Sequence, residues 1–227
     1  MNIAIIPARG GSKRIPRKNI KAFHGKPMIA YSIQAAIESG CFEKVIVSTD
    51  DTEIAKIATK YGAEVPFMRP ANVSGDHATT LDVIKHAIEF LRLKKWDVKN
   101  VCCIYATAPF ITSKSIEQGF VELISNDIDY AFSATSFPFP IQRAIRLNGE
   151  QHVEMFQPEY LNTRSQDLEE SYHDAGQFYW GKASAFLDDK PFFSLKSKAI
   201  LLPRKRVQDI DTPEDWELAE ILYKALQ

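Results

Sequence analysis

Short runs of β-branched residues alternate with stretches of helical periodicity over the first 136 residues of the chain. Strands that alternate with helices in this way pair in parallel through right-handed crossovers, and the helices cover both faces of the sheet. The chain is therefore expected to adopt an α/β fold, a three-layer α/β/α sandwich around a mostly parallel sheet. Strands are predicted at 3–8, 44–50, 64–70, 100–109 and 130–137, and helices at 27–39, 51–62, 79–94 and 113–126.

Local signals support two of these elements. The segment NVCCIYATAP at 100–109 is almost continuously hydrophobic, which is typical of a central strand covered on both faces. The helix after the second strand has Asp50 as its expected cap, and Glu53 follows three residues later in a capping-box pattern. Asp50 is therefore first interpreted as a helix cap and only second as a site residue.

The alternation breaks between residues 137 and 172, where the chain is polar and aromatic and has only short strand-like pieces. Long irregular insertions are usually functional or mediate contacts. Because 227 residues suit one domain better than two, we expect residues 1–227 to form a single domain with an insertion at 137–172. The main fold then resumes with a strand at 177–181, a helix at 182–188, a strand at 199–204 and a helix at 213–226.

Composition excludes several classes of protein. A formal charge of −1 argues against a general nucleic-acid binder, which is usually basic over the whole domain. No apolar run reaches the roughly 20 residues of a membrane-spanning helix, and the N-terminus does not have the pattern of a signal peptide. Cys41, Cys102 and Cys103 are odd in number and lack metal-binding spacing, so free thiols and a cytoplasmic location are expected.

The first predicted strand runs into a loop of concentrated positive charge, IIPARGGSKRIPRKN. A loop at the carboxyl end of a parallel strand lies where open α/β sheets bind ligands. Gly10 and Gly11 allow the backbone N–H groups to converge on an anion, and Ser12 adds a hydroxyl donor. Five cations fall within ten positions of this loop: Arg9, Lys13, Arg14, Arg17 and Lys18.

This loop predicts a cradle for a polyphosphate, in which Arg9, Lys13 and Lys18 supply charge. It contains neither GxxxxGK[ST] nor GxGxxG, so an ordinary P-loop or dinucleotide fold is not indicated. Arg14 and Arg17 are expected to face solvent or to shape the electrostatic field. A solvated basic loop or a targeting tract is the alternative interpretation.

Two carboxylates near the C-terminus form a candidate metal site. At strand spacing Asp209 and Asp211 project to the same side of the chain, and paired hard oxygen ligands suit Mg²⁺ together with phosphate oxygens. The alternative is that Asp211 or Thr212 caps the final helix ahead of Pro213. Capping would not explain Asp209.

The ordered motifs of this chain resemble those of the sialic-acid-type cytidylyltransferases, which make CMP-activated nonulosonic acids. The motifs are IPARGGSKRIPRKN, VIVSTDD, RPANVSGDHATT, TAPF and QDIDTPED, and they extend over nearly the whole chain. The segment HDAGQFYWG resembles the pseudaminic acid branch of the family, where sialic acid enzymes have an Asn-Gly-Ala-Tyr-like pattern. Tyr105 also stands where the sialic acid enzymes have a glutamine, which favours a differently decorated sugar.

The resemblance implies a nucleotidyltransferase-like fold and a transfer of CMP from CTP to the anomeric hydroxyl of pseudaminic acid, a nine-carbon acidic sugar, for bacterial surface glycans. Pyrophosphate would leave, steadied by Arg9 and Lys18, and Asp209 and Asp211 would hold the catalytic Mg²⁺. The implied nucleotide-binding residues are Ala8, Arg9, Gly10, Gly11, Ser12, Lys18, Asn19, Arg69, Asp76 and Thr80. The implied sugar-binding residues are Tyr105, Arg164, His173, Asp174 and Gln177.

Some of these assignments have structural alternatives: Arg69 and Asp76 could form an ion pair, and His173 could be an ordinary loop histidine. In the family the inserted segment pairs two subunits, so 137–172 is expected to be a dimerisation arm that also completes the partner's sugar site. Competing functions are a sialic, legionaminic or Kdo cytidylyltransferase, a glycosyltransferase, and a non-catalytic nucleotide- or RNA-binding module. A glycosyltransferase usually has its Asp-x-Asp in mid-chain, unlike the pair at 209–211.

Overall fold

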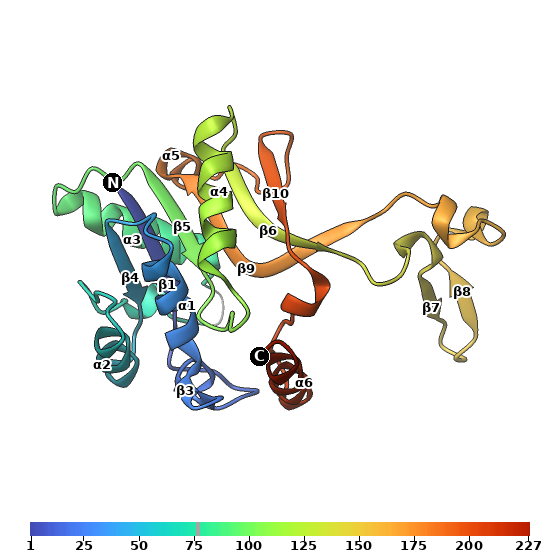
Figure 1. The fold of residues 1–227 in the computed structure, drawn as a ribbon, viewed down its shortest axis with the longest axis horizontal. Helices are drawn as coiled ribbons and strands as arrows, with labels where there is room; N and C mark the ends of the chain where they lie inside the picture. Colours follow the sequence, from blue (N-terminus) through green and yellow to red (C-terminus); the bar gives the residue numbers. More distant parts are fainter. Residues whose placement is uncertain (76–77) are drawn as a thin grey trace.

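The computed structural model describes residues 1–75 and 78–227, so the predicted site residue Asp76 lies outside the described residues. Its centre is a six-stranded sheet of order β10-β6-β9-β5-β1-β4 (Figure 1). These strands span Asn2–Pro7 (β1), Lys44–Ser48 (β4), Asn100–Ile104 (β5), Tyr130–Ser136 (β6), Tyr172–Lys182 (β9) and Ser197–Leu201 (β10). β1 pairs in parallel with β4 and β5, and β10 pairs in parallel with β6.

β9 alone runs against its neighbours in this sheet, antiparallel to both β5 and β6. The chain leaves the sheet at the carboxyl end of β6 and comes back at that same end, so the returning strand has to run in the opposite direction. The strand also starts earlier than the predicted 177–181. Its pairing with β6 shifts register opposite Phe132 and Ala134, next to Gly176, which has a φ of +60°.

Helices cover both faces of the sheet, which confirms the predicted three-layer α/β/α sandwich. They span Met28–Glu38 (α1), Thr52–Lys60 (α2), Thr80–Leu93 (α3), Ser113–Ser125 (α4), Ala183–Leu187 (α5) and Pro213–Ala225 (α6). Alternate residues of β1 point to opposite faces, so Ala4 and Ile6 pack with α1, α2 and α4. Ile3 and Ile5 pack with α3 and α5 on the other face.

A third apolar cluster fixes α6 against the N-terminal part of the chain. It lies against the hairpin of β2 (Ala22–Phe23) and β3 (Lys26–Pro27), where the Phe23 and Trp216 rings meet edge to face at 5.5 Å. Ile15 of the opening loop and Ile210, between the two predicted metal ligands, are both buried in this cluster. The first loop and the last connecting segment are thereby held together (Figure 1).

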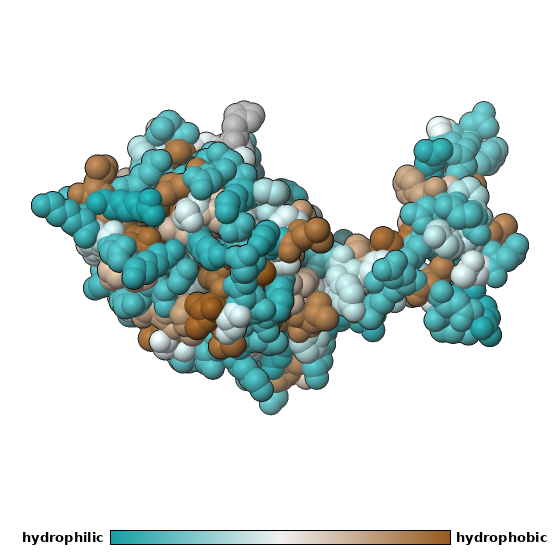
Figure 2. Space-filling view, turned by 90° about the horizontal axis from the view of Figure 1, so that it is seen from above, coloured by the Kyte–Doolittle hydropathy of each residue, from teal (hydrophilic) through white to brown (hydrophobic). Residues whose placement is uncertain are grey.

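Between β6 and β9 the chain forms an arm that projects from the body (Figure 1). It carries an antiparallel hairpin of β7 (Ile145–Leu147) and β8 (Val153–Met155) and several single 3-10 turns. Figure 2 shows a narrow segment between body and arm, with apolar side chains on the arm's surface. Exposed apolar residues of the arm include Phe139, Ile145, Leu147, Val153, Phe156 and Leu161.

Three predictions about local structure were wrong. The segment 64–70 makes only two isolated bridges, Ile46–Glu64 and Thr49–Met68, because its prolines cannot donate to a ladder. The predicted strand 100–109 stops at Ile104, and the following residues form a loop. Asp50 does not cap α2; that cap is Asp51, which accepts hydrogen bonds from the backbone of Glu53 and Ile54. In the described parts of the chain, no helix is long and apolar enough to cross a membrane.

Candidate active site

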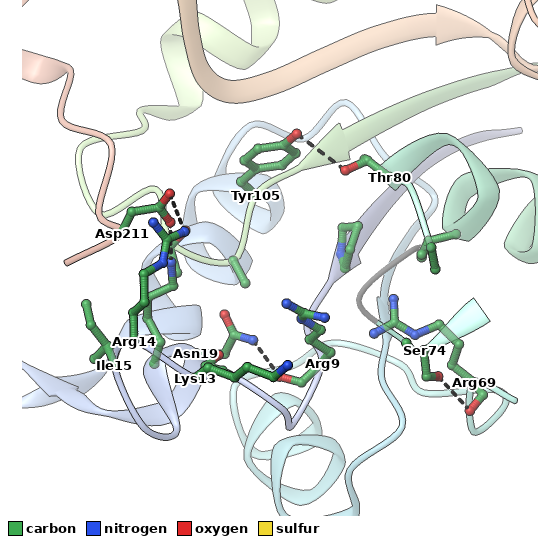
Figure 3. A pocket seen from close by; sticks show the side chains of 18 of the residues that line it. Arg9, Lys13, Arg14, Ile15, Asn19, Arg69, Ser74, Thr80, Tyr105 and Asp211 are labelled. Carbon is green, nitrogen blue, oxygen red and sulfur yellow. Dashed lines mark hydrogen bonds and ion pairs between the residues drawn. The ribbon is translucent and has the colours of Figure 1, made fainter. Parts of the chain in front are cut away.

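A pocket of about 560 Å³ opens at the carboxyl ends of β1, β4 and β5 (Figure 3). Loops that follow parallel strands meet at this edge, which is where open α/β sheets bind ligands. The residues that line the pocket are Pro7, Arg9, Ser12, Lys13, Arg14, Ile15, Lys18, Asn19, Arg69, Val73, Ser74, Gly75, Ala78, Thr80, Val83, Tyr105, Ala106, Thr107 and Asp211.

Hydrogen bonds to the backbone of the opening loop hold it in place. Gly10 N–H donates to Asp50 Oδ1 at 2.9 Å, and the side-chain amide of the buried Asn19 donates to the Arg9 carbonyl at 2.9 Å. A Cβ on Gly10 would come within 2.7 Å of Asp51 Oδ2, so this close approach requires glycine.

The two loop glycines do not line the pocket, and the Gly10 N–H is not free to form an anion nest. Neither Gly10 nor Gly11 adopts a positive φ, and the N–H of Gly10 is already used by Asp50. The predicted Ala8 is buried behind them and donates to the Ser48 carbonyl at 2.9 Å. In this conformation the loop therefore presents side chains, not a ring of backbone N–H groups, to the pocket.

Four of the five loop cations line the pocket, and Arg17 does not. Figure 3 shows Arg9 between Lys13 on one side and Arg69 on the other. Arg17, in left-handed conformation with φ of 56°, instead binds Asp51 and Glu53 at the start of α2. The interpretation of Arg17 as a residue outside the site thus fits its position, whereas Arg14 lines the pocket while its side chain stays 64% exposed.

Among the described residues that line the pocket, Asp211 is the acidic one, and two loop cations bind it. Lys18 Nζ lies 3.1 Å from Asp211 Oδ1 and 2.5 Å from the carbonyl oxygen of Ile210, and Arg14 Nη2 lies 2.7 Å from Asp211 Oδ2. Burial works to raise the pKa of Asp211, but the hydrogen bond and charge of Lys18, with those of Arg14, hold it below its usual value. The carboxylate is therefore charged across the neutral range.

The carboxylate pair is not needed to cap the last helix. Thr212 caps α6 in a capping box with Asp215, so Asp209 and Asp211 are left for another role. Asp209 is exposed and does not line the pocket, but desolvation and then the charge of Asp211 raise its pKa, so the two carboxylates interact. Two such carboxylates, with phosphate oxygens as further ligands, fit a Mg²⁺ site. Among the described residues no cluster of three or more metal-binding side chains occurs, so a cation here would depend on its substrate for ligands.

Arg69 brings an incompletely paired guanidinium to the opposite wall. Its side chain is only 3% exposed, its Nη2 lies 3.9 Å from Asp50 Oδ1, and its Nε has no hydrogen-bond partner among residues 1–75 and 78–227. Burial lowers the pKa of this arginine. A buried N–H group that borders a pocket and has no protein acceptor is a strong candidate to bind a ligand oxygen.

A smaller cavity of about 160 Å³ shares Thr80 and Tyr105 with the main pocket. Its other lining residues are Leu81, Ile84, Cys103, Asp174, Tyr179, Phe186, Phe192 and Phe193. Asp174 is the one charged group among them, and it accepts hydrogen bonds from Tyr179 Oη and from Gly176 N–H. The wall is otherwise apolar and aromatic, which suits an apolar substituent with one polar anchor.

The remaining predicted sugar residues lie elsewhere. Arg164 is on the arm and pairs with Asp167, with Nε and Oδ2 2.7 Å apart. His173 lies against the Phe137 ring, and its Nδ1 is 2.8 Å from the Asp174 carbonyl oxygen. Gln177 is buried and donates from Nε2 to the Arg206 carbonyl at 2.5 Å. None of these three residues lines the main pocket or the smaller cavity next to it.

Some residues that border the site were not predicted from the sequence. Phe192 and Phe193 line the small cavity, and their only signal was an aromatic pair in a loop. Asp50, for which a site role was only the second interpretation, supports both the opening loop and Arg69. Ser74 and Thr107 also line the main pocket.

Comparisons with known proteins agree with this site. Residues 3–222 match the family model described as cytidylyltransferase. The chain is 49% identical over 223 residues to the pseudaminic acid cytidylyltransferase of Campylobacter jejuni subsp. jejuni serotype O:2, covering 98% of this chain and 96% of that protein. It is 35% identical to the CMP-N,N'-diacetyllegionaminic acid synthase of Legionella pneumophila subsp. pneumophila, covering 99% and 97%. The fold matches the solved structure of CMP:2-keto-3-deoxy-manno-octonic acid synthetase complexed with CTP, with a TM-score of 0.72, 17% identity and coverage of 100% and 99%.

Proposed function

The chain belongs to the cytidylyltransferase family, and from this premise we propose that it transfers CMP from CTP to the anomeric hydroxyl of pseudaminic acid. The observation that carries the proposal is the main pocket, which is lined by four cations of the opening loop and by Asp211, with Lys18 and Arg14 paired to that carboxylate. A small apolar cavity adjoins this pocket and gives room for a second substrate. The product would be the CMP-activated sugar for bacterial surface glycans, and pyrophosphate would be released.

The loop cations account for binding of the triphosphate. The sugar hydroxyl attacks the α-phosphorus, and the bond from that phosphorus to the bridging oxygen of the leaving pyrophosphate breaks. Negative charge then grows on the α-phosphoryl oxygens and on the pyrophosphate, so positively charged groups that are already in position lower the barrier. Arg9, Lys13, Arg14 and Lys18 line the pocket where this charge would develop.

Asp209 and Asp211 are the residues that would hold Mg²⁺, with substrate oxygens completing its coordination. When bound, the ion would polarise a phosphoryl oxygen and offset the charge of the triphosphate. The protein's own contribution is to keep the carboxylate of Asp211 ionised in the wall of the pocket. Lys18 does this for Asp211 through its contacts with the carboxylate and with the Ile210 carbonyl.

Arg69 and Thr80 are assigned to the nucleotide on the opposite wall. The guanidinium of Arg69 is buried and has an N–H group without an acceptor in the described part of the chain, and an oxygen of the nucleotide would satisfy it. Thr80 Oγ1 lies 3.4 Å from Tyr105 Oη, so these two hydroxyls mark the boundary between the main pocket and the small cavity.

The small cavity is assigned to an N-acyl group of the sugar. Its aromatic wall would bury the methyl of such a group, and Asp174 would accept a hydrogen bond from an amide or hydroxyl. Burial raises the pKa of Tyr179, so its phenol stays neutral and keeps donating to Asp174. Tyr105, shared by both cavities, would contact the sugar near the reacting hydroxyl.

The arm is assigned to a homodimer. Ile145 faces Met155 and Leu147 faces Val153 across the hairpin, which puts these four residues on one face. Arg146 and Glu154 form an ion pair on the other face, with Nε and Oε2 2.9 Å apart. An exposed apolar face on a projecting hairpin suits a second copy of the chain. Arg164, on the same arm, would then reach the partner's sugar site. The free state of all three cysteines supports a cytoplasmic location.

The experiment is a pyrophosphate-release assay with a panel of nonulosonic acids. Turnover is expected only when CTP, Mg²⁺ and the sugar are all present, and pseudaminic acid should be preferred over sialic and legionaminic acids. Good turnover with sialic acid and none with pseudaminic acid would overturn the sugar assignment. Equal turnover with ATP would overturn the CTP assignment. Transfer of sugar from a CMP donor to an acceptor would instead indicate a glycosyltransferase.

A further inference from the structure

We propose that Asp50 is a positioning residue for nucleotide binding, whose carboxylate couples the phosphate-binding loop to Arg69. The inference rests on the proposed function, because it assumes that the main pocket binds CTP. Asp50 itself does not line that pocket. Asp50 lies directly behind two groups at the edge of the pocket, one from the loop after β1 and one from the segment after α2.

A single oxygen of Asp50 makes both contacts. Oδ1 accepts the N–H of Gly10 at 2.9 Å and lies 3.9 Å from Nη2 of Arg69. The Gly10 contact fixes the peptide next to Arg9, which lines the pocket. The Arg69 contact gives a negative neighbour to a guanidinium whose side chain is 3% exposed. The loop and the opposite wall therefore share one support.

The electrostatics of Arg69 show why that support is needed. Burial and the positive charge of Arg9 both work against a charged guanidinium, and the charge of Asp50 works for it. Its Nε, also buried, has no acceptor among the residues that the structure describes. A buried cation without its counter-charge is strongly unfavourable, so without Asp50 the side chain is expected to turn toward solvent. That movement would take the guanidinium out of the wall of the nucleotide pocket.

The next residue in the chain has a different task, which makes it a matched control. Asp51 accepts the backbone N–H groups of Glu53 and Ile54 as the cap of α2, and it binds Arg17. It contributes to the stability of α2 and has no contact with Arg69. Of these two adjacent aspartates, Asp50 thus supports the site and Asp51 stabilises the helix.

Conservative substitutions separate the two contacts of Asp50. Asp50→Asn keeps an acceptor for Gly10 but removes the charge beside Arg69, so it should raise KM for CTP about tenfold and change kcat little. Asp50→Ala removes both contacts and should also lower kcat, because the loop that carries Arg9 loses its anchor. Asp51→Asn should leave KM for CTP within about twofold while lowering Tm by about 2–4 °C.

A double-mutant cycle tests whether Asp50 acts through Arg69. If it does, Asp50→Asn in an Arg69→Met background should raise KM for CTP no further than Arg69→Met alone. Independent effects that simply multiply would overturn the proposal. A lower KM for CTP in Asp50→Asn would also overturn the proposal, since this result would mean that the carboxylate acts only by repelling the triphosphate.

Binding of CTP to each folded variant, measured by calorimetry without sugar, gives a second readout. Weaker binding to Asp50→Asn than to Asp51→Asn would support the proposal, and equal binding would overturn it. Failure of the proposed function is distinguishable, because the unsubstituted protein would then not bind CTP or would release no pyrophosphate. A normal unsubstituted enzyme with an unchanged Asp50→Asn variant would refute only the role of Asp50.

Discussion

Lys18 Nζ lies 3.1 Å from Asp211 Oδ1, which joins residues 193 positions apart in the chain. The same amino group donates to the Ile210 carbonyl at 2.5 Å, and Ile210 is buried in one cluster with Ile15. The pocket is therefore closed by its first loop and its last connecting segment together. Lys18 serves two purposes in this arrangement, as a cation for the triphosphate and as the anchor of a carboxylate.

Replacing Lys18 should damage turnover far more than stability. Lys18→Gln is expected to lower kcat by about 10²–10³, which is typical of a lost charged contact in the transition state. The free energy of unfolding should change by less than about 1 kcal/mol, because Arg14 still pairs with Asp211. Steady-state kinetics and thermal melting measure the two effects.

Lys21→Gln is the control for that experiment. Lys21 is exposed, lies outside the pocket and places its amino group 4.3 Å from the centre of the Trp216 ring. Its replacement removes the same charge from the same part of the chain and should leave kcat unchanged. Equal losses in both variants would mean that only the overall positive field of the loop matters.

Asp209→Asn should abolish Mg²⁺-dependent turnover without unfolding the protein. The loss in kcat is expected to be at least about 100-fold. Because the pKa of Asp209 is raised in the folded state, its charge costs stability at neutral pH, so the free energy of unfolding should stay the same or rise. At limiting Mg²⁺, turnover of the unsubstituted enzyme should decrease as the pH is lowered through the pKa of Asp209, which is raised above 3.8.

Glu214→Gln, in the exposed first turn of α6, is the charge-matched control for Asp209→Asn. Full activity of Asp209→Asn would refute the ligand role.

Local periodicity predicted the layers of this fold well, because each helix buries one face and the central strands bury both, each with its own pattern. It could not give the direction of β9, which depends on where the arm leaves and returns. The sequence pattern also could not decide whether Asp50 or Asp51 caps α2, since both are aspartates next to the start of that helix. Gln177 shows the limit for site residues: it lies in a segment that resembles a sugar site, yet its amide donates to the Arg206 carbonyl.

Acid should remove the stabilising contribution of Asp51. The hydrogen bond from Arg17 holds the pKa of this carboxyl at about 2, below its ordinary 3.8. A depressed pKa contributes stability that is full above the unfolded-state value and is lost as the pH falls through the folded one. Asp51→Ala should therefore lower the free energy of unfolding by about 1–2 kcal/mol at pH 7, and the difference should narrow between pH 4 and pH 2.

Urea unfolding across this pH range measures that difference. Glu53→Ala is the comparison, because Glu53 also pairs with Arg17 but is 66% exposed and should contribute less than about 0.5 kcal/mol. A difference between Asp51→Ala and the unsubstituted protein that stays constant down to pH 2 would contradict the assignment of the charged cap.

Phe193 should affect the sugar substrate and not CTP. Its ring lines the small cavity but is 72% exposed, so Phe193→Ala removes a wall of the cavity without opening the core. KM for the sugar should rise about tenfold, KM for CTP should stay the same, and Tm should change little. Leu195→Ala, fully exposed and outside the cavity, is the matched control. An equal rise of both KM values would place the ring in the nucleotide site instead.

The arm should hold two copies of the chain together through the apolar face of its hairpin. Leu147 and Val153 are paired across β7 and β8 and are 56% and 62% exposed, so Leu147→Asp with Val153→Asp puts two charges at the centre of the proposed interface. Light scattering should then give the mass of one chain in place of two, and KM for the sugar should rise because Arg164 can no longer reach the partner's site. Arg146→Gln, on the opposite face, should leave the dimer intact. A single-chain mass for the unsubstituted protein would contradict the assignment, because the apolar face would then have no second copy to cover it.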